Sequence, residues 1–100
     1  MTNLANDLDP ELREIVRRTR ELTNDRMLRL PEATAKIGVA TSTFWKLHSE
    51  KKLPSLISIG PHSVAWRESE LQAWIDANTY ASRSKRQIDM KIFIAALTSL

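Results

Sequence analysis

The stretch that decides the fold runs from Met27 to Thr79 and reads MLRLPEATAKIGVATSTFWKLHSEKKLPSLISIGPHSVAWRESELQAWIDANT. Leu30-Pro31-Glu32 is typical of a helix start, because proline is tolerated in the first turn and an acid there meets the positive helix end. Gly38 then predicts the end of that helix, since glycine readily adopts the left-handed conformation of a helix cap. Phe44 and Leu47, at i and i+3, predict the buried face of a second helix.

The residues after this second helix predict a hairpin and a further helix. Leu53-Pro54 ends the second helix, and two β-prone runs, at 56–59 and 64–67, flank the turn residues Gly60-Pro61-His62-Ser63. Arg67-Glu68-Ser69-Glu70 opens a helix with an apolar face of Leu71, Trp74 and Ile75. Helix, glycine turn, helix, hairpin and helix is the order of a winged helix-turn-helix, so we predict a mainly α fold with a small β-hairpin wing.

Both flanks of this unit also have helical patterns. Asp9-Pro10-Glu11 predicts a helix start, followed by an apolar stripe and an end at Asn24-Asp25. We expect Met1–Leu8 to be frayed. Residues 83–86 form a basic connector to an apolar helical tail that we expect not to bury itself. The predicted stripe consists of Leu12, Ile15, Val16, Thr19 and Leu22, and the predicted tail face of Ile88, Ile92, Phe93, Ala96 and Leu100.

The predicted organisation is therefore an N-terminal amphipathic helix extension over residues 1–26, a winged helix-turn-helix over 27–80, and a basic linker with an apolar helical tail over 81–100. One hundred residues are enough for one small domain with such extensions. A core of this size depends on a few large side chains. We expect these to be Trp45, Trp66 and Trp74, with Phe44.

Composition excludes several classes of function. The chain has no cysteine, two histidines and two glycines, which leaves no thiolate metal site and no glycine-rich phosphate loop. No nucleophile motif is visible either. We therefore predict no enzyme activity, no cofactor and no metal. The longest apolar run, Ile92–Leu97, is far shorter than the ~20 residues of a membrane span, and no signal peptide is apparent, so we expect a cytoplasmic protein without a membrane partner.

The charge is unevenly distributed. The net charge of +3 divides into −1 for residues 1–26, +1 for 27–80 and +3 for 81–100. A basic chain favours a polyanionic partner, although many proteins without one are equally basic.

A helix that enters the DNA major groove must present short polar or cationic side chains to base edges and phosphates. With Phe44 and Leu47 facing inward, the outer face of the second helix carries such residues. The turn of the hairpin supplies further donors for the adjacent minor groove or a phosphate strand. The predicted DNA-binding residues are Thr41, Ser42, Thr43, Trp45, Lys46, Ser49, His62, Ser63 and Arg67.

Several of these residues have alternative roles. Trp45 is either a core aromatic or an indole that lies against a sugar-phosphate strand. Arg67 either contacts DNA or forms an ion pair with Glu70, three residues along the chain. Lys51 and Lys52 either reach phosphate or simply oppose the helix dipole.

The same stretch resembles the AlpA family of phage-type regulators, within the MerR-like winged helix-turn-helix group that also contains excisionases. The resemblance covers about half of the chain. Its most specific part is the tryptophan and arginine of Val64-Ala65-Trp66-Arg67-Glu68-Ser69-Glu70 together with Trp74-Ile75. Further marks are Leu30-Pro31-Glu32, Ile37-Gly38-Val39, Ser42-Thr43-Phe44-Trp45-Lys46-Leu47, Leu53-Pro54 and Ile59-Gly60.

This resemblance implies a sequence-specific DNA-binding protein of a mobile genetic element, such as a prophage or genomic island. It would act as an excisionase, a transcriptional regulator or both. The implied partners are double-stranded DNA, further copies of the chain on that DNA, and a site-specific integrase as a candidate. The implied location is the bacterial nucleoid. The first-helix stripe and the apolar tail are two candidate surfaces for contacts between copies. The alternative for each is that it packs against the chain's own domain, and for the first helix this alternative is favoured.

A second hypothesis comes from a different class of function. The family usually places Arg or Lys near the start of the second helix, where this chain has Ala40-Thr41. This sparse charge favours an antitoxin-like or adaptor-like module that binds a protein partner and has lost its DNA role.

Overall fold

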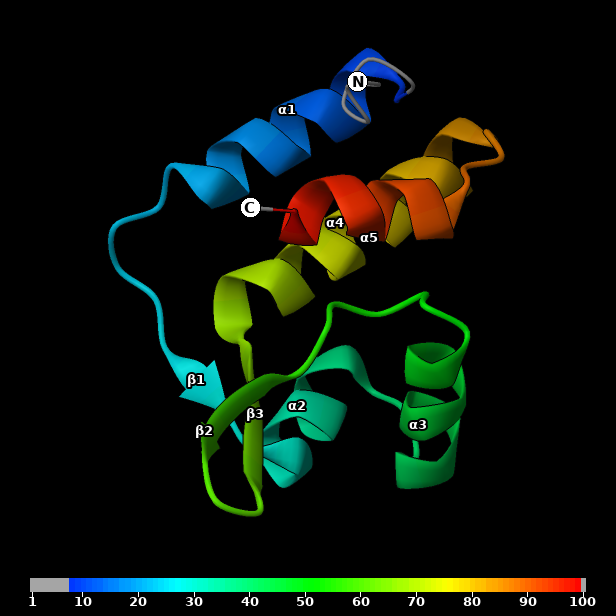
Figure 1. The fold of residues 1–100 in the computed structure, drawn as a ribbon. Coiled ribbons are helices and arrows are strands. Elements are labelled where there is room, and N and C mark those ends of the chain that lie inside the picture. The colour runs from blue at the N-terminus through cyan, green and yellow to red at the C-terminus, as the bar shows by residue number, and fades with distance from the viewer. Residues whose placement is uncertain (1–7, 100) are drawn as a thin grey trace.

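A computed structural model describes residues 8–99 of the chain. Its elements follow one another as α1, β1, a helix pair, a hairpin and two further helices (Figure 1). Their bounds are α1 Pro10–Arg20, β1 Met27–Leu28, α2 Leu30–Ile37, α3 Thr41–Ser49, β2 Ile57–Gly60, β3 Ser63–Arg67, α4 Glu68–Ser84 and α5 Met90–Thr98. The predicted winged helix-turn-helix with extra terminal helices is confirmed.

The wing is a three-stranded sheet in the order β1-β3-β2. The sequence predicts the hairpin of β2 and β3 but only an extended lead-in before α2. That lead-in is instead strand β1, which pairs with β3 in antiparallel register, Leu28 opposite Trp66. Leu28 is 1% and Trp66 0% exposed, so the pairing places two core side chains side by side on one face of the sheet.

A first core cluster holds the sheet to the helix pair. Trp66 lies at its centre: its ring packs edge-on against Phe44, with centroids 4.9 Å apart, and its Nε1 donates to the Pro54 carbonyl at 3.1 Å. The fully or nearly fully buried members are Leu28, Ala33, Phe44, Leu53, Trp66 and Leu71. The expected core role of Trp66 is confirmed.

A second core cluster joins the two terminal helices. Phe93 of α5 is fully buried among residues of α1 and α4, which shows that the prediction of an unburied tail is wrong. The sequence did not reveal this because the partners of α5 lie far away along the chain. The buried residues of this cluster are Leu8, Leu12, Ile15, Val16, Ala73, Ala77, Phe93, Ile94, Ala96 and Leu97.

Three further expectations for the N-terminal segment are also corrected. α1 ends at Arg20, with Glu21 as its cap, rather than at Asn24-Asp25. Leu22, the last residue of the predicted stripe, is 49% exposed. Leu8 is buried, so the last residue of the stretch expected to fray packs into the core.

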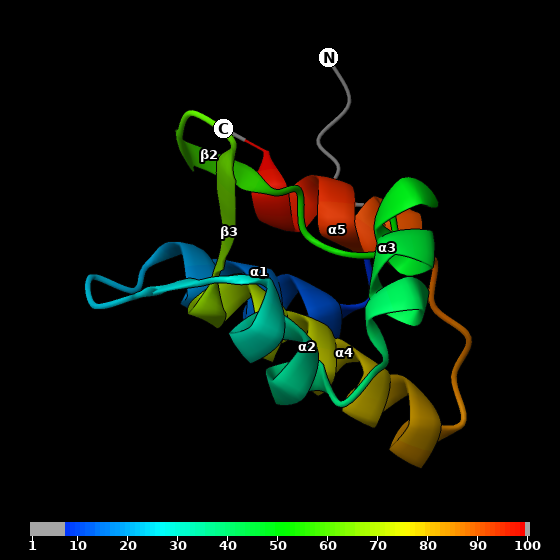
Figure 2. The ribbon, with the colours of Figure 1, turned by 90° about the horizontal axis from the view of Figure 1, so that it is seen from below.

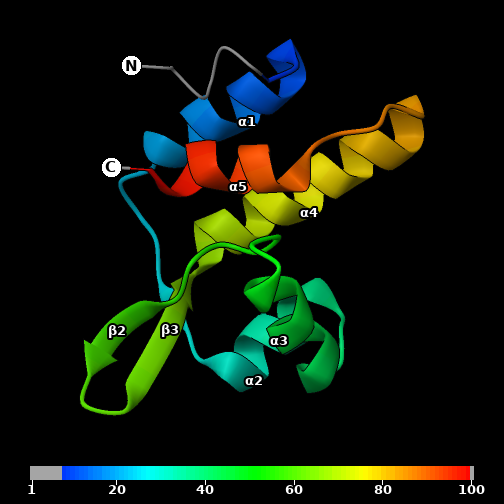
Figure 3. The same ribbon diagram turned by 45° about the vertical axis from the view of Figure 1, so that its right-hand side comes forward.

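Helix α4 is shared by the two clusters and lies between them in the molecule (Figure 3). Leu71 belongs to the first cluster, Ala73 and Ala77 belong to the second, and Trp74 packs against both. The Trp74 Nε1 donates to the Lys52 carbonyl at 2.9 Å. Because α4 continues to Ser84, residues 81–84, predicted as linker, are helical.

The expectations for Met1–Asp7 and for Leu100 lie outside the described residues. Within residues 8–99, every helix is too short or too polar to cross a membrane. In Figures 1 and 3, the hairpin, α2 and α3 form the end of the molecule opposite α1 and α5. The view in Figure 2 shows β2 and β3 on one side of this end and α3 on the other.

Candidate nucleic-acid interface

Helix α3 presents a continuous polar face. Gly38, at φ 73°, caps α2 in the left-handed conformation, and the short connection leads into α3. Phe44 anchors α3 at 0% exposure. Ser42, Lys46 and Ser49 are exposed, and their i, i+4, i+7 spacing places them in one row along the helix. Thr41 and Thr43 are exposed beside this row.

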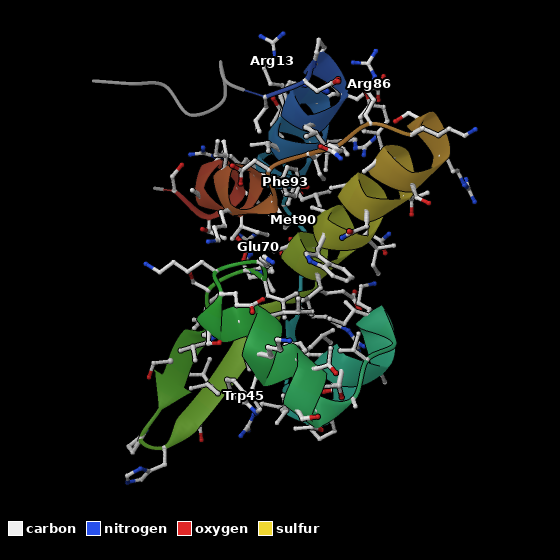
Figure 4. All side chains as sticks on the ribbon, turned by 90° about the vertical axis from the view of Figure 1, so that its right-hand side faces the viewer. Arg13, Trp45, Glu70, Arg86, Met90 and Phe93 are labelled. Atoms are coloured by element: carbon white, nitrogen blue, oxygen red, sulfur yellow. The ribbon has the colours of Figure 1, made fainter. Side chains whose placement is uncertain are left out.

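Trp45 lies at the edge of the polar face rather than in the core. Its indole contacts three aromatic neighbours: the ring centroids lie 6.0 Å from that of Phe44, 5.7 Å from that of Trp66 and 5.6 Å from that of His48. Yet 37% of the residue remains exposed, and Figure 4 shows it on the lower part of α3 next to the hairpin. The indole is therefore held at a fixed angle while one part of it stays accessible to a ligand.

The neighbouring histidine completes this aromatic group. The His48 ring lies 6.1 Å from that of Trp66. Burial lowers the pKa of His48, so this side chain is neutral at physiological pH. The cationic groups near α3 are therefore the lysines. Lys46 and Lys51 are exposed, whereas the Lys52 Nζ lies 3.5 Å from a Glu50 carboxylate oxygen.

The hairpin turn is formed by residues with unusual backbone angles. Gly60 has φ 156° and His62 has φ 60°, a left-handed value at which histidine is one of the more frequent non-glycine residues. The pairing of β2 with β3 is irregular between Ser58 and Gly60. His62 is exposed and Ser63 half-buried. The turn thus carries donor side chains at the end of the wing.

Arg67 contacts an acid that the sequence did not indicate. Its Nε lies 2.8 Å from Asp25 Oδ2, so the acid that it pairs with is Asp25 and not Glu70, the partner in one of its two predicted roles. The Asp25 carboxylate also accepts from the backbone N–H of Ser69 at 3.0 Å and from the Ser69 hydroxyl. Asp25 therefore caps the start of α4 from outside the helix and ties it to the end of β3. Since Asp25 is 42 residues from Arg67, local patterns give no sign of this link.

The carboxyl groups around this link have opposite pKa shifts. For Asp25, burial acts to raise the pKa, but the hydrogen bonds from Ser69, Arg26 and Arg67 outweigh it and the pKa is lowered. For Glu70, burial is the largest cause and the pKa is raised; Arg67 opposes this shift and Asp25 adds to it. The fold thus favours the ionised form of Asp25, which holds Arg67 and the start of α4.

We expect Asp25→Ala to lower the free energy of unfolding by about 1–2 kcal/mol at pH 7, the usual cost of a lost helix cap. Because the pKa of Asp25 is lowered in the folded state, the stabilisation that Asp25 gives the fold is complete above the pKa that this carboxyl has in the unfolded chain. It is lost as the pH falls through the folded pKa, below about 4. Urea denaturation of the wild type and of Asp25→Ala at pH 7 and at pH 3 tests this prediction. A difference that is the same size at both pH values would contradict the assignment.

The described residues do not form a group of acidic or histidine side chains that could hold a metal ion. What the structure brings together is the α3 row, Trp45 and, at the same end of the molecule, the hairpin turn (Figure 4). Arg67 lies apart from these, at the base of β3, and its side chain is 39% exposed.

Comparison with known proteins agrees with this architecture. Residues 26–79 match the family model described as "Prophage CP4-57 regulatory protein (AlpA)". The chain is also 35% identical, over 65 residues, to an uncharacterized protein, ORF88, of Enterobacteria phage P4. The aligned residues cover 65% of this chain and 73% of the phage protein. No solved structure matches. The match begins just before β1 and ends within α4, so it contains the complete helix pair and wing but neither α1 nor α5. The chain belongs to the AlpA family of prophage regulatory proteins.

Proposed function

We propose that this protein binds double-stranded DNA of a mobile genetic element and regulates it, with α3 in the major groove. The observation that carries the proposal is the exposed row of Ser42, Lys46 and Ser49 on a helix anchored by Phe44, inside the unit that matches a family of prophage regulatory proteins. Such side chains have the size and hydrogen-bonding capacity that base edges and phosphates require.

Each candidate residue has a specific role in this arrangement. Thr41 and Ser42 offer hydroxyls and the backbone N–H groups of the α3 N-terminus to a phosphate. Lys46 supplies the cation in the middle of the row, and Thr43 and Ser49 flank it. Trp45 lays its accessible indole against a sugar-phosphate strand. At the wing, His62 and Ser63 are the donors for a neighbouring strand.

Arg67 has a smaller direct role in this proposal than the other residues. Its Nε is used by Asp25, so only the remaining guanidinium N–H groups are available to a phosphate. Its main contribution to DNA binding is to hold β3 against the start of α4 and so fix the position of the wing.

The proposed regulator acts as an excisionase, as a transcription factor, or as both. A small protein makes few phosphate contacts, so one copy binds weakly and in a strongly salt-dependent manner. We therefore propose that several copies bind side by side and bend the DNA, with a site-specific integrase as partner during excision. The buried faces of α1 and α5 are occupied within the chain, so contacts between copies use other surfaces.

The experiment that tests the proposal is a titration of the protein onto labelled DNA from the attachment-site region of its own element and onto scrambled DNA, over a salt series. We expect selective, cooperative shifts with the first DNA. Weak and equal binding to both, lost near physiological salt, would refute the proposal and direct the search to a protein partner, as expected for an antitoxin-like or adaptor-like module.

Replacing Thr41 and Lys46 together by alanine should remove selective DNA binding. Each contact of this kind contributes about 1–3 kcal/mol, so we expect an affinity loss of at least about 30-fold. Both residues are exposed, so the urea midpoint should not change. Lys36→Ala is the control, because Lys36 lies on α2 and its Nζ donates to Gln72 at 3.0 Å. Selective binding that survives the double substitution would show that α3 is not the recognition helix.

A further inference from the structure

The proposed DNA surface does not end with α3, because a groove continues from its last turn to helix α5. This groove has a volume of about 470 Å³ and lies between the chain that leaves α3 and one face of α5. Figure 3 shows the segment between α3 and β2 passing below α5. The groove is lined by His48, Ser49, Lys51, Leu53, Ser55, Lys91, Ile94, Ala95 and Thr98.

The lining has the composition of a phosphate-binding surface. It contains the cations Lys51 and Lys91 together with the hydroxyl of Ser55, and none of its residues is acidic. The hydroxyls of Ser49 and Thr98 donate to the backbone carbonyls of Lys46 and Ile94. Lys51, at φ 60°, follows α3 in a left-handed conformation and is exposed. Among the described residues, neither Lys51 nor Lys91 forms a salt bridge with an acid. Both ammonium groups are therefore available to an external anion.

The position of Lys91 follows from how α5 packs. Phe93, Ile94, Ala96 and Leu97 are buried, which leaves Lys91, Ala95 and Thr98 at i, i+4 and i+7 along the open side. Ala95 and Thr98 have short side chains, so Lys91 is the one long side chain that projects from this side of α5. Asp89, two residues before Lys91, caps α5: its Oδ1 accepts from the N–H of Lys91 at 3.0 Å and of Ile92 at 3.3 Å.

A second groove places another lysine near the same point. Lys91 also lines a second cleft, together with Lys52, Asn78 and the acid Asp89. Lys51 and Lys52 are adjacent in the chain, so Lys91 lies close to two cations at the end of α3. Lys52 is partly neutralised by Glu50, which makes Lys51 and Lys91 the stronger pair.

The groove is continuous with the α3 face. Ser49 is the last residue of the exposed row and also lines the groove. A phosphate strand that follows the row of Ser42, Lys46 and Ser49 therefore arrives at Lys51 and Lys91. An acid-free groove at this place attracts a phosphodiester group electrostatically.

We infer that α5, which lies outside the unit shared with the AlpA family, contributes Lys91 to a DNA-phosphate site that it forms with Lys51 and the hydroxyl group of Ser55. This inference rests on the proposed function. It assigns to the C-terminal helix a role in affinity: the contact is with the sugar-phosphate backbone, so it strengthens binding to every DNA sequence equally.

The test compares Lys91→Gln, Lys51→Gln and the double variant with Lys36→Gln, which removes the same charge from α2. Loss of one phosphate contact lowers the slope of log K against log salt by about 0.9 and the affinity by about five- to tenfold near 0.1 M salt. We expect this change for each single variant, and about twice the slope change for the double variant. The loss of affinity should be equal on attachment-site and scrambled DNA, while the slope and affinity of Lys36→Gln stay close to those of the wild type. A thermal melt of each variant confirms that the fold is kept.

The outcomes separate this inference from the proposed function. If the wild type binds DNA selectively but Lys91→Gln has the same slope as Lys36→Gln, the α5 site is refuted and the α3 assignment stands. If all the lysine variants reduce the slope equally, only the total charge matters and the site is also refuted. If Thr41→Ala with Lys46→Ala keeps selectivity while Lys91→Gln weakens binding, the α5 site holds and the recognition helix is misassigned.

Discussion

Replacing Phe93 by alanine should lower the free energy of unfolding by about 3–5 kcal/mol, the cost of removing a fully buried phenyl group and leaving a cavity. Phe93 is 0% exposed and lies between α1 and α4. A small domain has a total stability of only about 5–15 kcal/mol. The variant should therefore unfold at a much lower urea concentration, although the residue belongs to a tail outside the family unit.

Two probes test whether the tail is part of one cooperative structure. Far-UV circular dichroism reports on all helices, and tryptophan fluorescence reports on Trp45, Trp66 and Trp74, which pack in or against the first cluster. Because α4 belongs to both clusters, we expect both signals to shift together. Leu22→Ala, at a residue 49% exposed, is the control and should cost little. A shift in circular dichroism alone would show that α1 and α5 fold as a separate unit.

Replacing Trp66 by alanine should have a similarly large effect, about 3–5 kcal/mol, at the opposite end of the molecule. Trp66 joins the wing to α3: it pairs with Leu28 across the sheet, packs edge-on against Phe44 and donates to the Pro54 carbonyl. Its loss leaves a large cavity and an unsatisfied buried carbonyl, which adds to the cost. We expect the position of the wing to be lost as well as stability.

Trp45→Ala is the matched control, because it removes the same side chain from a residue that is 37% exposed. We expect it to cost less than half as much in urea denaturation and to weaken DNA binding instead. Trp66→Phe should recover part of the stability, since it keeps an aromatic ring in the core but loses the N–H donor and the second ring of the indole. Equal costs at the two tryptophans would contradict their assignment as core and surface residues.

The helix-turn-helix and the hairpin were predictable because their signals are local. A proline near a helix start, a glycine in the left-handed conformation and an i, i+3 apolar pair each act within a few residues of chain. Gly38 and Phe44 have the predicted roles. The exposed face of α3 follows from the same periodicity, because once Phe44 faces the core, the helix geometry places Ser42, Lys46 and Ser49 outside.

The sequence by itself thus determined the order of the helices and the hairpin and the polar face of α3. Only the tertiary structure decided that Met27–Leu28 is a strand, that Asp25 caps α4 and holds Arg67, and that α5 is buried against α1 and α4. The physical reason is the same in each case. These contacts join residues far apart in the sequence, and an apolar or charged side chain carries no local sign of which distant partner it will meet once the chain has folded.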